Sequence, residues 1–108
     1  MENSRIEQIK NFLKETPLDT FLNYALAIEY VAIKKTNEAM EIFNKLIETN
    51  PEYSATYYHL GKLLLTQNKK AEAIKVFENG IKISMNNNET HAASELKAAL
   101  NEILYDED

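Results

Sequence analysis

The chain contains 108 residues and carries a formal net charge of −5, with two Gly, two Pro and no Cys. This length fits a single domain whose core needs no disulfide, and the lack of Cys excludes thiolate nucleophiles and cysteine metal sites. The acidic balance argues against a general nucleic-acid binder, and no apolar run is long enough for a membrane span or a signal peptide. We therefore expect a cytoplasmic protein, and the scarcity of Gly and Pro favours helices over hairpins.

Six helical patterns follow one another along the chain. In residues 36–49, for example, apolar residues gather on one side and charged residues on the other, as in an amphipathic helix. Thr16-Pro17 and Asn50-Pro51 each combine an N-cap side chain with a Pro suited to the first helical position. Asn86–Asn88 separates the last two patterns and offers a further N-cap. The predicted helices are 4–15, 18–34, 36–49, 52–67, 70–84 and 89–104.

The sequence repeats itself with a period of 34 residues, which is the distance from Pro17 to Pro51. A fixed period of roughly 20–50 residues indicates an array of stacked supersecondary units. At this interval identical residues recur throughout both helices of the unit. The matched pairs include Tyr24 with Tyr58, Leu26 with Leu60, Lys35 with Lys69, Ala39 with Ala73 and Phe43 with Phe77.

The repeated residues resemble the tetratricopeptide repeat, although Asn23 stands where that family usually has an aromatic and Leu46 where it has a small residue. The resemblance implies an all-α fold, a right-handed α-solenoid of antiparallel helix pairs. Gly61 and Gly80 lie inside predicted helices, where Gly costs about 1 kcal/mol relative to Ala, so we expect close helix contacts there. The residues expected to pack the repeats are Leu26, Ala27, Tyr30, Ala39, Phe43, Leu60, Gly61, Ala73, Phe77 and Gly80.

These patterns predict one domain that covers residues 1–108. It would consist of an N-terminal half-repeat helix at 4–16, repeats at 17–50 and 51–87, and a closing helix with an acidic tail at 88–108.

The first helix of each predicted repeat is apolar on two faces, whereas the second helix has one apolar and one charged face. A helix that is apolar on both faces is either buried on both or exposes one for binding. In the family that the chain resembles, the first helices line a concave groove. By that resemblance, a groove for a peptide or an amphipathic helix of another protein would be lined by Phe21, Tyr24, Ile28, Ala55, Tyr58, Lys62 and Leu65.

The sequence also allows this apolar surface to be covered rather than exposed for a partner. It could be covered within the chain, either by the first helix or by the closing helix with Ala92, Leu96, Ala99 and Leu100. Alternatively, two copies of the chain could bury it in a homodimer. Some members of the family hold acidic chaperone tails in a clamp of cationic side chains. Here only Lys62 suits such a clamp, which favours an apolar partner segment.

Residues for catalysis or for metal binding are scarce. His59 and His91 are the only histidines, and no third zinc ligand accompanies them. The sequence contains neither a phosphate-binding glycine loop nor a nucleophile elbow. We therefore expect a non-enzymatic adaptor without metal or cofactor, which binds proteins rather than nucleic acid or membranes.

Overall fold

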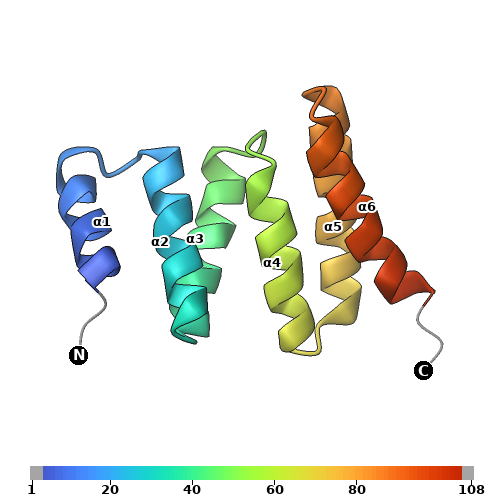
Figure 1. The fold of residues 1–108 in the computed structure, drawn as a ribbon, viewed down its shortest axis with the longest axis horizontal. Coiled ribbons are helices and arrows are strands. Elements are labelled where there is room, and N and C mark those ends of the chain that lie inside the picture. The colour runs from blue at the N-terminus through green and yellow to red at the C-terminus, as the bar shows by residue number, and fades with distance from the viewer. Residues whose placement is uncertain (1–3, 106–108) are drawn as a thin grey trace. The chain divides into compact units, whose positions relative to one another are not determined.

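The structure, a computed structural model, describes residues 4–105 and contains only α-helices in that range. The all-α class predicted from the sequence is therefore confirmed. The ends of the second and fourth helices differ most from the prediction. The helices are α1 (Ser4–Glu15), α2 (Thr20–Ala32), α3 (Thr36–Thr49), α4 (Ala55–Thr66), α5 (Lys70–Asn86) and α6 (Thr90–Leu104) (Figure 1).

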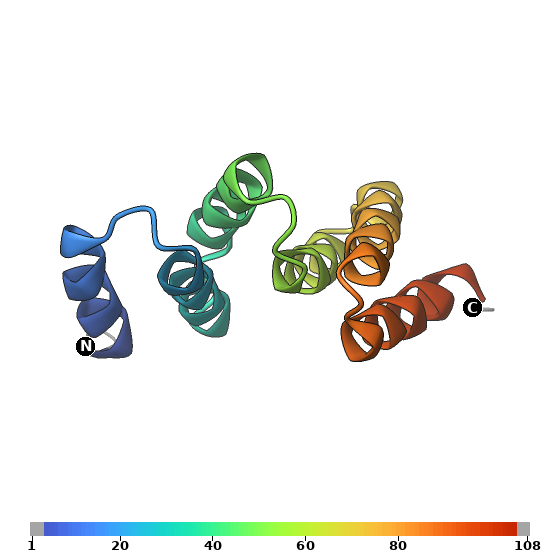
Figure 2. The same ribbon diagram turned by 90° about the horizontal axis from the view of Figure 1, so that it is seen from above.

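The helices group into two compact units, Met1–Asn50 and Pro51–Asp108. In the first unit, α2 and α3 form an antiparallel pair and α1 packs on α2. In the second unit, α4 and α5 form the pair, while α6 packs mainly on α5 and touches α4 less extensively (Figure 2). The division between the units falls at the position where the sequence predicts the second repeat to begin.

The first unit has a small core shared by α1, α2 and α3. Ile6, Ile9 and Leu26 are buried together, and Tyr30 and Ile42 pack against them. An ion pair between Arg5 Nε and Glu29 Oε2, 3.0 Å apart, also joins α1 to α2. The apolar face of α2 that carries Leu26 is therefore used for packing inside this unit.

The core of the second unit depends on its two glycines. A Cβ atom at Gly61 would lie 2.6 Å from Cζ of Phe77, and one at Gly80 would lie 2.6 Å from Cβ of Tyr57. The latter would also lie 3.1 Å from Cδ1 of Leu96 on α6. Side chains larger than hydrogen do not fit at these distances, so both glycines allow the close helix contacts expected from the sequence.

Three of the interhelical turns share one geometry. Lys34, Asn68 and Asn88 each have a left-handed backbone, with φ values of 65°, 61° and 61°. In the first turn, the amide of Lys35 donates to the carbonyl of Tyr30 at 2.9 Å, and equivalent bonds close the other two turns. This is the Schellman arrangement, in which a left-handed residue ends a helix and satisfies its last carbonyls.

The predicted helix starts at the two prolines are wrong, because both prolines lie in turns before their helices. The Asp19 carboxylate accepts from the amide of Leu22 at 2.8 Å and so caps α2, which begins at Thr20. The side-chain amide of Asn23 donates to the carbonyls of Pro17 and Asp19 at 3.0 and 2.9 Å, which keeps these residues in a turn. Side-chain contacts within the turn therefore decide where the helix starts.

Pro51 also lies in a turn before its helix, and the predicted capping role of Asn86–Asn88 is wrong as well. The hydroxyl of Tyr57 donates to the carbonyl of Pro51 at 2.6 Å, and α4 begins only at Ala55. The residues of the asparagine run end α5 rather than cap α6, whose N-cap position is occupied by Glu89.

Candidate partner-binding faces of α2 and α4

The second apolar face of α2 faces outward from the first unit. It is formed by Phe21, Tyr24, Ile28 and Val31, which we call the α2 face, and whose spacing places them on one side of a helix. Phe21 is 61% exposed and Val31 36%, while Tyr24 and Ile28 are half-buried. The rings of Phe21 and Tyr24 lie 6.4 Å apart, centroid to centroid, at an angle of 42°. This distance is within the range of favourable aromatic pairs.

The packing of α2 within the first unit explains why this face is exposed. Leu26 and Ala27 are buried, so the inward side of α2 is already occupied. Glu29, the only charged residue of α2, pairs with Arg5 on α1. Since the α2 face itself contains no charged residue, it combines low desolvation cost with exposed aromatic area, as binding surfaces do.

The corresponding face of α4 is more polar. It consists of Ala55, Tyr58, Lys62 and Leu65, which we call the α4 face; Lys62 is exposed and the others are half-buried. The Lys62 ammonium lies 5.8 Å from the centroid of the Tyr58 ring, within range of a cation–π interaction. The ring of His59 meets Tyr58 edge-on, with centroids 5.3 Å apart.

The closing helix borders the α4 face without burying it. Leu96 points at Gly80 on α5, and Tyr58 and Leu65 keep part of their surface exposed. A hydrogen bond joins the N-terminal ends of α4 and α6: the hydroxyl of Ser54, the N-cap residue of α4, donates to Oε1 of Glu89, the N-cap residue of α6, at 2.6 Å. Burial lowers the pKa of His59, while the negative charge of Glu95 on α6 opposes this shift.

The predicted site residues therefore lie in two groups. Phe21, Tyr24 and Ile28 belong to the first unit, and Ala55, Tyr58, Lys62 and Leu65 to the second, so each unit presents its own face. The residues expected to pack the repeats are all buried except Tyr30, which is half-buried.

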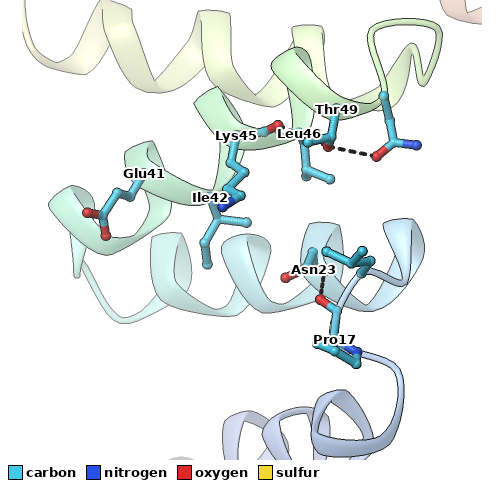
Figure 3. Close-up of a pocket in the computed structure, with 9 residues that line it drawn as sticks. Pro17, Asn23, Glu41, Ile42, Lys45, Leu46 and Thr49 are labelled. Atoms are coloured by element: carbon cyan, nitrogen blue, oxygen red, sulfur yellow. Dashed lines mark hydrogen bonds between the residues drawn. The ribbon is translucent and has the colours of Figure 1, made fainter.

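A pocket in the first unit was not predicted from the sequence. It has a volume of about 560 Å³ and lies between α3 and the turn that leads into α2 (Figure 3). At the position of Asn23, the second repeat has Tyr57, a larger side chain that makes the equivalent bond to Pro51. The departure of Asn23 from the family pattern was therefore the available signal. The pocket is lined by Pro17, Leu18, Asn23, Glu41, Ile42, Lys45, Leu46, Thr49 and Asn50.

Within residues 4–105, no group of three or more His, Asp or Glu side chains is placed to hold a metal ion. His91 is exposed, and its Nε2 lies 3.3 Å from Glu95 Oε2. None of the described helices has the length and apolar character needed to cross a bilayer.

Comparisons with known proteins agree with this architecture. A family model for the tetratricopeptide repeat matches residues 30–100. The solution structure of a tetratricopeptide repeat domain protein from Salinibacter ruber is 36% identical, with a TM-score of 0.78 over 81% of this chain and 88% of that chain. A protein from Bordetella parapertussis is 21% identical, with a TM-score of 0.83 over 98% of this chain and 91% of that chain, and this likeness shows the fold alone. No curated protein matches the sequence. The family match and the Salinibacter ruber structure together show that this chain belongs to the tetratricopeptide repeat family.

Proposed function

We propose that this chain is a protein-interaction module that binds an apolar peptide or an amphipathic helix of a partner protein. Tetratricopeptide repeats generally form modules for contacts between proteins and are generally not enzymes. The observation that supports the proposal best is the exposure of Phe21, 61% of whose surface is accessible beside the ring of Tyr24. The α2 face and the α4 face would each bind such a segment.

The chemistry of these faces favours an apolar partner segment with aromatic or aliphatic anchors. Complete burial of a Phe side chain contributes about 1.5–3 kcal/mol, so Phe21 alone could supply a substantial part of a weak affinity. Aromatic side chains at the centre of an interface commonly dominate its binding energy. Lys62 is the only charged residue in the two faces and adds one contact for a carboxylate at most.

A homodimer is the second candidate, because the exposed face that binds a partner could also bind the same face of a second copy. Sedimentation equilibrium separates the two. A chain that stays monomeric at high concentration contradicts the homodimer and leaves the binding proposal intact.

The proposal is tested by comparing two phenylalanines of similar exposure. Phe21 is 61% exposed on the α2 face, and Phe12 is 63% exposed on α1. Three chains are immobilised on resin: wild type, Phe21→Ala and Phe12→Ala. Each is incubated with extract from the native cells, and the proteins that it retains are quantified by mass spectrometry. We expect a partner that wild type and Phe12→Ala recover and that Phe21→Ala loses, with circular dichroism unchanged. Equal recovery by all three chains would contradict the proposal.

The proposal includes a cytoplasmic location and the absence of catalytic activity. Fractionation of the native cells tests the location directly.

A further inference from the structure

The α2 face ends at two lysines. Lys34 and Lys35 follow α2 directly, and both are exposed. From Phe21 to Val31 the face is uncharged, so the first charges beyond its C-terminal end are these two ammonium groups. The surface is therefore apolar along its length and basic at one end.

The turn between α2 and α3 does not require a cation at either position. Lys34 has a φ of 65°, a left-handed conformation that favours Gly or Asn and that Asn68 and Asn88 adopt in the other turns. Lys35 occupies the N-cap position of α3 without a side-chain capping bond, where Ser, Thr, Asp or Asn would stabilise the helix. A positive charge is unfavourable at the N-terminus of α3, although it is favourable at the C-terminus of α2, which both lysines follow directly. Within residues 4–105 neither lysine forms an ion pair.

The chain itself contains a segment with the complementary order of side chains. Leu104 is 50% exposed and Tyr105 is 74% exposed at the end of α6. In the sequence they are followed by Asp106-Glu107-Asp108, which lie outside the described residues. Two exposed apolar residues are thus followed by three carboxylates, as the α2 face is followed by two lysines.

We propose that the segment 104–108 of one copy of this chain binds the α2 face of a second copy. Leu104 and Tyr105 contact the apolar part of the face, and the three carboxylates lie near Lys34 and Lys35. The inference rests on the proposed function, since it names an occupant of the same face.

A synthetic peptide of residues 101–108 tests the contact directly. The peptide carries a fluorescent label, and its anisotropy is measured while full-length chain is added. We expect saturable binding that weakens as salt is raised, because exposed ion pairs are screened. Lys34→Gln/Lys35→Gln should weaken it roughly three- to tenfold, as expected for the loss of two exposed pairs.

The matched control is Lys75→Gln/Lys82→Gln, which removes the same charge from exposed positions on α5. It should bind the peptide like wild type. Equal weakening by both double variants would show a general charge effect and would overturn the inference. A peptide that does not bind wild type would also overturn it.

Sedimentation equilibrium of the full chain tests whether the segment comes from a second copy. We expect association that increases with concentration and that Tyr105→Ser reduces. If the peptide binds but wild type stays monomeric, the segment does not join two copies and the inference is wrong. The proposed function fails separately, when Phe21→Ala recovers the same partners as Phe12→Ala.

Discussion

Gly61 on α4 lies directly against the ring of Phe77 on α5, and a Cβ atom at Gly61 would be 2.6 Å from Phe77 Cζ. Phe77 has no exposed surface, so its ring is surrounded and has little space to move. The pair shows why a residue that weakens an isolated helix is present in the middle of α4.

Gly61→Ala should therefore destabilise the protein. Overpacking costs about 1–3 kcal/mol and outweighs the gain in helix propensity of about 1 kcal/mol. The free energy of unfolding in urea measures the difference. Asn79→Ala, at an exposed position on α5, is the control and should stabilise the protein slightly, by up to about 0.7 kcal/mol, through helix propensity alone. A Gly61→Ala protein as stable as wild type would show that the contact with Phe77 can relax.

Tyr57→Phe should cost about 0.5–1.5 kcal/mol, because it removes the 2.6 Å hydrogen bond from the Tyr57 hydroxyl to the carbonyl of Pro51. Tyr58→Phe is the matched control, since the described residues provide no hydrogen-bond partner for the half-buried Tyr58 hydroxyl. Thermal unfolding followed by circular dichroism compares the two. Equal loss of stability in both variants would mean that the bond to Pro51 contributes nothing specific.

Thr56→Val should be neutral or stabilising. The Thr56 side chain is fully buried, and among residues 4–105 its hydroxyl has no hydrogen-bond partner. Replacing an unsatisfied hydroxyl by a methyl group of similar size removes a desolvation penalty of about 1–3 kcal/mol. Ser54→Ala provides the contrast, because it removes the 2.6 Å bond from Ser54 to Glu89 and should destabilise. A marked loss of stability in Thr56→Val would reveal a partner for the hydroxyl, such as a buried water.

The stability of the protein should decrease as the pH falls below about 6.5, the ordinary pKa of histidine. Burial lowers the pKa of His59 in the folded state, despite the opposing charge of Glu95, so the unfolded chain takes up a proton more readily. The stability that depends on neutral His59 is fully present above the pKa that His59 has in the unfolded chain. It is lost as the pH falls through the lower pKa that His59 has in the folded protein.

His59→Gln should flatten this part of the pH dependence of the unfolding free energy, measured in urea between about pH 7.5 and pH 5. The comparison is His91→Gln, at an exposed position on α6, and the flattening should be larger in His59→Gln. The same slope in His59→Gln and wild type would assign the pH dependence to other groups.

Much of the candidate site follows from helical periodicity, which is a local property. The spacing of Phe21, Tyr24 and Ile28 already places them on one side of a helix. Their exposure could not be predicted in this way, because it depends on which neighbouring helices cover each face of α2. The pocket beside Asn23 was missed for a similar reason, since it is formed by residues of α3 and of the turn before α2.

The sequence by itself determined the six helices, the period of 34 residues and the family, because these depend on the order of apolar, polar and small residues along the chain. The tertiary structure decided the helix starts after Pro17 and Pro51, where the side chains of Asn23 and Tyr57 bond back to the turns. It also decided that Phe21 is exposed while Leu26 is buried. Both residues are apolar, and only the packing of α1 and α3 against one side of α2 distinguishes them.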